Sequence, residues 1–317
     1  MFLGIVLTIG GLLALSTVYH QIRKLTEVKK NTPPGEMIKV GDSEMHIYGQ
    51  GEGSPTILFT CGNGLGFTLG KFYPTISKLA ERHRVVVYDR FGYGWSGSTS
   101  EPRTLERINE ELFELLDKSR ETGPFILVGH SFGVTESIEF AKRYPELVAG
   151  VVSLDGTSPA FYKGRKDLYK QNIVASSLLR FLSFTGLLRV ISNLGLFTTT
   201  GESTPKEIVR VTNMMTYNRV YSKEAVGEVM ALIDGNVEKG TLGDIPVLVL
   251  TADNEKLKKK QPEMYQDFVN SQTDLLALST RSQQKIIKDA DHFFPIKMPD
   301  VVTDELQSFL DAYAAKA

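Results

Sequence analysis

The sequence predicts an α/β fold with a mostly parallel central sheet, helices on both faces of the sheet, an inserted helical cap and an N-terminal transmembrane helix. From Met37 onwards, short apolar runs typical of buried strands alternate with stretches of helical periodicity. The alternation stops between residues 157 and 243 and then resumes. The N-terminal segment Phe2–Tyr19 contains no charged side chain. The predicted organisation is an anchor (1–22), a linker (23–36), a core in two parts (37–156 and 244–317) and a cap (157–243).

The composition is that of an ordinary globular protein. The chain has 317 residues, of which 42% are hydrophobic and 23% charged, so it can bury a sizeable core. A net charge of −1 gives no reason to expect nucleic acid as a partner. The single cysteine, Cys61, excludes an intramolecular disulfide and a cysteine-rich metal site. No His-Glu-x-x-His motif is present either, so neither a metal nor another cofactor is expected.

The uncharged N-terminal segment is best explained as a membrane anchor. As a helix, its 18 residues would span about 27 Å, close to the roughly 30 Å hydrocarbon core of a bilayer. A cleaved signal peptide would carry lysine or arginine before the apolar run, and none is present there. A buried core helix would show a polar face, for which only Thr8, Ser16 and Thr17 are available.

Positive charge follows the anchor, since Arg23, Lys24, Lys29 and Lys30 outnumber a single glutamate. By the positive-inside rule, this flank and the catalytic domain after it should face the cytoplasm. Residues 31–35 contain two consecutive prolines, which cannot continue a helix and therefore indicate a linker.

The first part of the core should contain a hairpin and four buried strands. The hairpin is predicted over Met37–Gly49, and the strands over Thr56–Cys61, Arg84–Tyr88, Pro124–Val128 and Leu147–Leu154. Helices are predicted over Phe72–Arg82 and Glu101–Glu121, and after the run Pro124–Val128 as far as Tyr144, where Pro145 stops the helix.

The cap and the second part of the core follow. The cap lacks apolar strand runs and is predicted as helices and loops. Its segment Ile173–Phe197 is apolar with scattered arginines, which suits an acyl chain or a membrane face, but we expect it to pack on the core. The last strands are predicted over Pro246–Leu250 and Lys285–Ile287, and the last helices over Pro262–Ser279 and Pro299–Ala315.

A nucleophile elbow is predicted at Gly129–Gly133, whose sequence is Gly-His-Ser-Phe-Gly. The motif follows an apolar strand and opens a helix, which is the context that a Gly-x-Ser-x-Gly elbow requires. Glycines on both sides allow strand and helix to approach closely, so that Ser131 lies on a tight bend. We predict Ser131 as the nucleophile, which needs a base and a third group to orient that base.

His292 is the predicted base. Of the five histidines, His20 and His46 precede the sheet, His83 is at a helix end and His130 is inside the elbow. Only His292 follows the last predicted strand, where a loop can reach over the carboxyl edge of the sheet. This position also fits the order serine, acid, histidine that is typical of this topology.

Two strand ends offer candidates for the acid that orients the base. Asp155 ends the strand after the elbow unit, and Asp253 and Glu255 follow the next strand. Spacing from Pro246 favours Glu255 over Asp253. We predict Asp155, with Glu255 as the alternative, although any of these carboxylates could instead cap a turn.

Two backbone N–H groups are expected to bind the oxyanion. One belongs to Phe132, directly after the nucleophile, and the other to Asn63 in the glycine-rich loop after the strand Thr56–Cys61. Each such donor is typically worth about 3 kcal/mol of transition-state stabilisation.

From Met37 to the C-terminus, the chain resembles the α/β-hydrolase superfamily, in particular its serine esterase and lipase branch. The resemblance is carried by Gly129–Gly133, by the loop Asp89–Ser96 (Asp-Arg-Phe-Gly-Tyr-Gly-Trp-Ser) and by Asp291-His292-Phe293. The loop is similar to the Asp-Arg-x-Gly-x-Gly-x-Ser segment of esterases, lipases and C–C hydrolases. A serine at position 131 argues against haloalkane dehalogenases and epoxide hydrolases, which have aspartate there.

The chain departs from the family pattern at two positions. Cys61-Gly62 stands where the family often has His-Gly, which leaves the backbone donors of the oxyanion site unchanged. Glu255 stands where aspartate is commoner, which keeps Asp155 as the first choice for the acid.

The sequence therefore predicts a membrane-anchored serine hydrolase that cleaves carboxylic esters, with a small-molecule ester or lipid as substrate. Two alternatives remain: a ligand-binding or signalling protein that keeps the fold with little or no turnover, and an amide or C–C bond hydrolase that uses the same residues.

Overall fold

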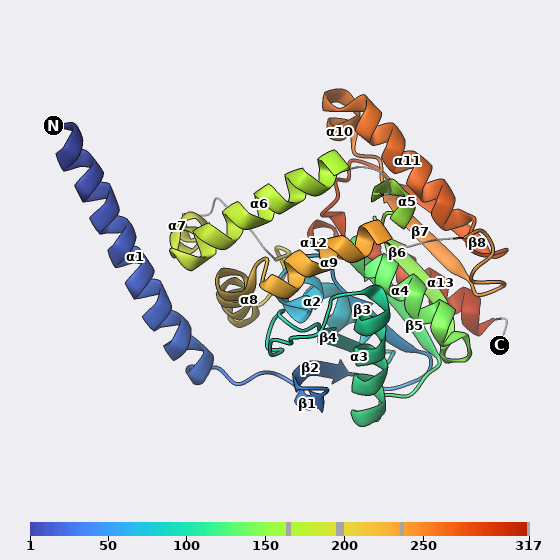
Figure 1. Cartoon of the computed structure of the whole chain (residues 1–317). Helices are drawn as coiled ribbons and strands as arrows, with labels where there is room; N and C mark the ends of the chain where they lie inside the picture. The colour runs from blue at the N-terminus through green and yellow to red at the C-terminus, as the bar shows by residue number, and fades with distance from the viewer. Residues whose placement is uncertain (163–165, 195–199, 235–237, 316–317) are drawn as a thin grey trace.

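Eight strands form one sheet at the centre of the protein (Figure 1). The computed structural model describes residues 1–162, 166–194, 200–234 and 238–315. The spatial order of the strands is β1-β2-β4-β3-β5-β6-β7-β8, with β1 and β2 antiparallel to their neighbours and the strands from β4 to β8 mutually parallel. The strands are β1 Glu36–Val40, β2 Ser43–Gln50, β3 Thr56–Thr60, β4 Val85–Asp89, β5 Phe125–His130, β6 Val148–Leu154, β7 Val247–Ala252 and β8 Ser282–Ile287.

Helices cover both faces of the sheet (Figure 1). They are α1 Phe2–Lys30, α2 Thr68–Leu79, α3 Leu105–Lys118, α4 Phe132–Arg143, α5 Pro159–Tyr162, α6 Lys166–Phe184, α7 Leu187–Asn193, α8 Lys206–Arg219, α9 Lys223–Asp234, α10 Glu255–Lys260, α11 Pro262–Leu276, α12 Phe294–Lys297 and α13 Pro299–Ala314, with a 3₁₀ turn at Pro145–Leu147. The strand and helix pattern predicted from the sequence is thus confirmed.

The sheet has an apolar core on each face. Along β3, Ile57 and Phe59 join a buried cluster with residues of α2 and α13, whereas Leu58 joins a second cluster with residues of α3, α4 and α11. Successive side chains of a strand point to opposite faces, so burial on both faces explains why the parallel strands are continuous apolar runs.

Several element ends differ from the prediction. The third helix begins at Leu105 and not near Glu101, because the Thr104 side chain accepts a hydrogen bond from the backbone N–H of Arg107 and caps it there. The strand β8 begins at Ser282, three residues before the predicted start, because it pairs along its whole length with β7 despite its polar residues.

In its described residues, the segment between β6 and β7 consists of helices and connecting turns, with no strand. It contains α5 to α9, and we call residues 157–243 the cap. The exact domain boundaries predicted from the sequence stay predictions. Residues 195–197, at the end of the apolar segment Ile173–Phe197, lie outside the described residues.

The N-terminal helix is longer than predicted. It continues through residues 23–30, which were expected to begin the linker, and ends at Lys30. This part contains no glycine or proline, and Arg23 forms a hydrogen-bonded ion pair with Glu27 one turn later, at 2.8 Å. Only residues 31–35 separate α1 from the sheet. Among the described helices, α1 is the single helix long and apolar enough to cross a bilayer, a property that signal sequences share; Lys170–Phe184 and Leu187–Asn193 reach that length and apolarity only when taken together across their bend.

The C-terminal half of α1 is attached to the cap, while its N-terminal half extends away from the protein (Figure 1). The Ser16 hydroxyl donates to the carbonyl oxygen of Thr185 at 2.8 Å, and the Gln21 amide donates to that of Phe184 at 2.9 Å. Arg189 of α7 donates two hydrogen bonds, of 2.9 and 2.8 Å, to the Glu27 carboxylate. The helix is therefore held against α6 and α7 over its last turns.

A buried ion cluster joins the cap to the sheet. The Arg90 guanidinium, after β4, donates to Glu136 of α4 at 2.8 Å and to Glu228 of α9 at 2.9 Å, and all three side chains are almost fully buried. Tyr88 donates to Glu136, and Tyr93 donates to Glu228 at 2.5 Å. Burial and the nearby Glu228 charge raise the pKa of Tyr93, so its hydroxyl stays protonated. Each charge thus has partners that compensate for its loss of hydration.

We expect Glu228→Gln to lower the free energy of unfolding by about 3 kcal/mol, because it leaves part of a buried cation uncompensated. Urea unfolding of the full chain in detergent, followed by tryptophan fluorescence, measures this. Glu139→Gln is the matched control, because Glu139 pairs with Arg143 at the surface, where such pairs contribute about 1 kcal/mol or less. Equal effects of the two substitutions would contradict a special role for the buried cluster.

Candidate active site

The predicted nucleophile lies on a strained turn between β5 and α4. Ser131 has φ of 54° and ψ of −120°, which non-glycine residues rarely adopt. A Cβ atom on Gly129 would lie 2.5 Å from the carbonyl oxygen of Gly133, and one on Gly133 would lie 2.7 Å from that of Thr60. Glycines at these two positions therefore allow the close crossing of strand and helix that the elbow requires.

The turn borders a cavity of about 270 Å³ at the carboxyl ends of the parallel strands. Four of the residues predicted from the sequence line it: Ser131, His292, Asn63 and Phe132. Tyr162 and Asn172, from α5 and α6, line the side of the cap. The structure thus brings the predicted nucleophile, base and oxyanion residues to one cavity.

The fifth predicted residue, Asp155, contacts the predicted base. His292 lies in the turn before α12, and its Nδ1 is 2.8 Å from Oδ2 of Asp155. The other carboxylate oxygen, Oδ1, accepts a hydrogen bond of 2.7 Å from the backbone N–H of Ala252 at the end of β7. The aspartate is buried, whereas the His292 side chain is 38% exposed. A carboxylate held at both oxygens fixes the imidazole orientation and keeps its proton on Nδ1.

The alternative acid lies elsewhere. Glu255 begins α10, where its half-exposed side chain accepts a hydrogen bond from Lys258 at 3.2 Å. The Asp253 carboxylate accepts hydrogen bonds from the backbone N–H groups of Asp289 and Ala290, at 3.0 and 3.2 Å. It therefore shapes the turn that precedes His292. Of the three carboxylates considered from the sequence, Asp155 is the one that the structure brings to the base.

His130 packs against His292, the predicted base. Its ring centroid is 4.9 Å from that of His292, and its Nε2 donates to the carbonyl oxygen of His292 at 3.0 Å. Burial, with the nearby His292 and Lys71 as further causes, lowers the pKa of His130 to about 3. The ring therefore stays neutral at physiological pH and adds no positive charge beside the base.

The loop that carries Asn63 is tied to the cap. Its side-chain amide donates to the carbonyl oxygen of Ala225 at 2.6 Å and to Glu228 at 3.1 Å, both on α9. The loop also runs close to the nucleophile, since a Cβ atom on Gly62 would lie 3.0 Å from Cβ of Ser131. Fixed donors are what an oxyanion site needs, because they require no reorganisation during the reaction.

Sequence reasoning missed the charged residues that support this loop. Glu136 has a signal that could have been found, because it is the charged residue among the apolar or small residues at the start of the elbow helix, before Glu139. Glu228 has none, since α9 carries several acids and only the fold shows that Glu228 is buried and faces Arg90.

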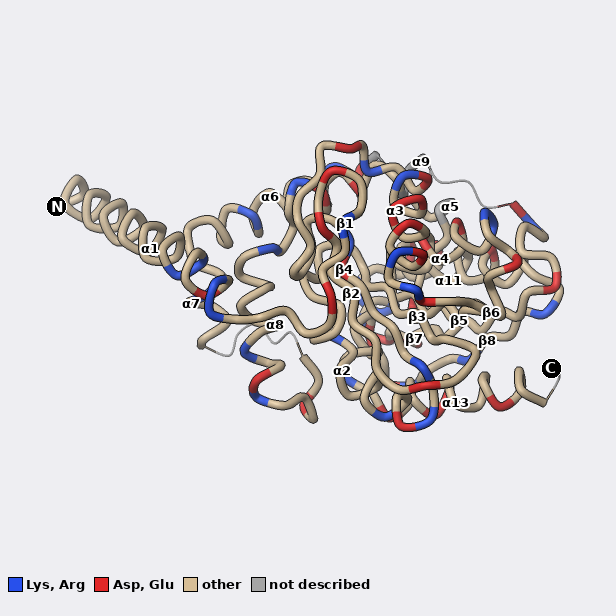
Figure 2. The backbone as a smooth tube through the Cα atoms, turned by 90° about the horizontal axis from the view of Figure 1, so that it is seen from below, with Lys and Arg blue, Asp and Glu red and all other residues tan. Residues whose placement is uncertain are grey.

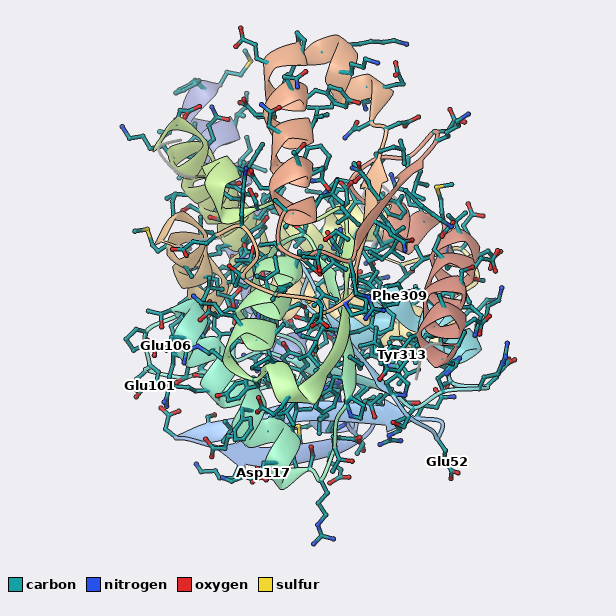
Figure 3. The ribbon with its side chains drawn as sticks, turned by 90° about the vertical axis from the view of Figure 1, so that its right-hand side faces the viewer. Glu52, Glu101, Glu106, Asp117, Phe309 and Tyr313 are labelled. Carbon is teal, nitrogen blue, oxygen red and sulfur yellow. The ribbon has the colours of Figure 1, made fainter. Side chains whose placement is uncertain are left out.

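A second cavity, of about 320 Å³, lies between β8 and α13, where Phe309 and Tyr313 line it (Figure 3). It is at the amino ends of β7 and β8, away from the predicted residues. Within the described parts of the chain, no cluster of three or more His, Cys, Asp or Glu side chains could hold a metal ion.

Comparison with known proteins agrees with this geometry. Residues 55–299 match the model of the family described as alpha/beta hydrolase fold. The chain belongs to this family. This α/β hydrolase is 27% identical over 145 residues to the uncharacterized protein YbdG of Bacillus subtilis, which covers 46% of the chain and 45% of the relative. It is 30% identical over 122 residues to a 2-(acetamidomethylene)succinate hydrolase of Mesorhizobium japonicum, covering 38% and 42%.

These alignments span less than half of either curated relative. A solved structure of a thermophilic esterase from Thermogutta terrifontis is similar over 88% of this chain and 99% of that one, with a TM-score of 0.61 and 19% identity. At 19% identity, the similarity between the two structures shows a shared fold and nothing further.

Asp155→Asn should reduce kcat for a short-chain p-nitrophenyl ester by about a thousandfold, because the amide favours the wrong tautomer of His292. Glu255→Gln is the matched control and should leave kcat within about twofold, since Glu255 has no contact with the base. Steady-state kinetics of both variants show which carboxylate orients His292. A large loss in the Glu255 variant alone would assign the acid to α10.

Proposed function

We propose that this protein is a membrane-anchored serine hydrolase that cleaves carboxylic esters through an acyl-enzyme. The observation that carries the proposal is the hydrogen bond from His292 Nδ1 to Asp155, in the cavity that also contains Ser131 on a strained turn. This arrangement leaves Nε2 of His292 to accept the serine proton, as the activation of a serine hydroxyl requires.

The proposed reaction has two stages. Ser131 Oγ attacks the ester carbonyl carbon while His292 Nε2 takes its proton, and the backbone N–H groups of Phe132 and Asn63 bind the oxyanion. When the tetrahedral intermediate collapses, the alcohol leaves with the proton from His292. A water molecule, activated by the same imidazole, then attacks the acyl-enzyme and releases the carboxylic acid.

The membrane part of the proposal is supported by α1. Its segment Phe2–Tyr19 is uncharged, and none of its apolar window is buried in the protein. The positively charged flank at Arg23, Lys24, Lys29 and Lys30 favours a cytoplasmic orientation of the catalytic domain.

A fluorophosphonate probe should label the full chain in detergent at Ser131, because the probe reacts with serines activated by a base. Labelling should be lost in Ser131→Ala and retained in the matched control Ser308→Ala, whose serine lies on the surface of α13. An unlabelled wild-type protein with an intact circular dichroism spectrum would refute the hydrolase mechanism and favour the ligand-binding alternative.

A substrate panel then tests the bond that is cleaved. Esters should be hydrolysed faster than matched amides and β-diketones. Amides belong in the panel because one relative is named for an acetamide-bearing substrate. A clear preference for amides or diketones would keep the serine mechanism and replace the ester assignment.

A further inference from the structure

The cap helix α6 exposes large apolar side chains on one face and buries two serines on the other. Val174, Leu178 and Phe181, spaced by four and three residues, form one face of the helix and are exposed, Leu178 to 57%. The opposite face carries Ser176, which is fully buried, and Ser183, which is nearly so. A surface helix of a soluble protein normally buries its apolar face. The expectation that this segment packs on the core is therefore wrong for the outer face of α6.

Exposed apolar side chains continue past the bend between α6 and α7, which we call the corner, and into α7. Phe184, Val190 and Leu194 are also exposed, and α6 and α7 meet at an angle of 86°. We call these six side chains, from Val174 to Leu194, the apolar cap face. A concentration of exposed large apolar side chains points to a site of interaction with a protein or a membrane.

The N-terminal helix leaves the protein at this same corner. Ser16 and Gln21 bind the carbonyl oxygens of Thr185 and Phe184, between α6 and α7. The uncharged part of α1 continues outward from there, and α6 runs across its direction (Figure 1). If α1 crosses a bilayer, the corner lies at the bilayer surface and α6 lies along that surface. This geometry favours a lipid bilayer as the partner of the apolar cap face.

The charges next to the corner are also suited to binding a lipid bilayer. A groove of about 570 Å³ between α1, α7 and α8 is lined by one acid, Glu27, and by five cations, Arg23, Lys30, Arg189, Lys206 and Arg210. Basic residues gather where α1 meets α7 and α8, and none lies on the outer part of α1 (Figure 2). Basic clusters directly beside a membrane helix attract anionic lipid headgroups.

We propose that the apolar cap face lies in the interface of the bilayer that α1 crosses, and that lipophilic esters reach Ser131 from the membrane. The helix α6 connects the apolar cap face with the cavity of Ser131, because Asn172 near the start of α6 lines that cavity. This inference rests on the membrane-anchored hydrolase proposed above and adds to it a source of substrate.

The position of the cap is tested by fluorescence quenching of the full chain in liposomes that contain anionic phospholipid. An environment-sensitive dye is attached to a cysteine introduced as Leu178→Cys. The native Cys61 will not react, because it is buried, and burial raises the pKa of its thiol to about 11. Ile286→Cys, at an exposed apolar position on β8, is the matched control, and Leu7→Cys reports on α1.

Nitroxide-labelled lipids should quench the dyes at positions 178 and 7 and leave the dye at 286 unquenched. Quenching at position 7 without quenching at 178 would overturn the proposal and leave the anchor in place. No quenching at position 7 would refute the anchor itself. A blue-shifted dye at 178 that lipid nitroxides do not quench would assign the face to a second protein copy, which also overturns the proposal.

Kinetics test the route of the substrate. The double variant Leu178→Gln/Phe181→Gln should hydrolyse an ester dissolved in the bilayer about tenfold more slowly, with an unchanged rate on a water-soluble ester. Ile286→Gln should change neither rate. Equal rates of the double variant and the wild type on the bilayer ester would refute entry from the membrane, whereas the fluorophosphonate reaction tests the hydrolase mechanism independently.

Discussion

The arrangement of the site depends on one buried cation, the Arg90 guanidinium. It lies between the carboxylates of Glu136 and Glu228, which come from the elbow helix and from the cap. It also donates to the carbonyl oxygen of Cys61, where the loop that carries Asn63 begins. None of these charges would be stable alone in the interior, so each requires the others in place. The three segments that surround the cavity are therefore positioned by a shared ion cluster.

The parallel register of two strands explains why the candidate nucleophile and acid are close together. His130 of β5 pairs with Leu154 of β6, so the next residues, Ser131 and Asp155, leave the sheet at the same level. Both have positive φ values, of 54° and 51°. Strain of this kind persists only where surrounding contacts over-determine it, and here the contacts come from the crossing of α4 and from β7.

The sequence was sufficient to predict the sheet, because buried parallel strands are continuous apolar runs whose order follows from their connections. It also led to the cavity residues, since Gly-x-Ser-x-Gly and a histidine after the last strand have few alternative arrangements in this topology. It did not separate Asp155 from Glu255 decisively, because both follow strands that end at the same edge. The burial of Glu228 and the exposure of Leu178 were beyond reach, since both depend on how the cap helices are rotated against the sheet.

The attachment of α9 to the loop that carries Asn63 limits how the cavity can widen. Lifting α9 would separate Glu228 from Arg90 and Asn63, and breaking a buried ion pair costs about 3 to 5 kcal/mol. That side of the cap is therefore held against the sheet by buried charges. Asn172, near the start of α6, borders the same cavity and takes no part in this ion cluster. A bulky ligand could thus be accommodated beside α6 without separating these charges.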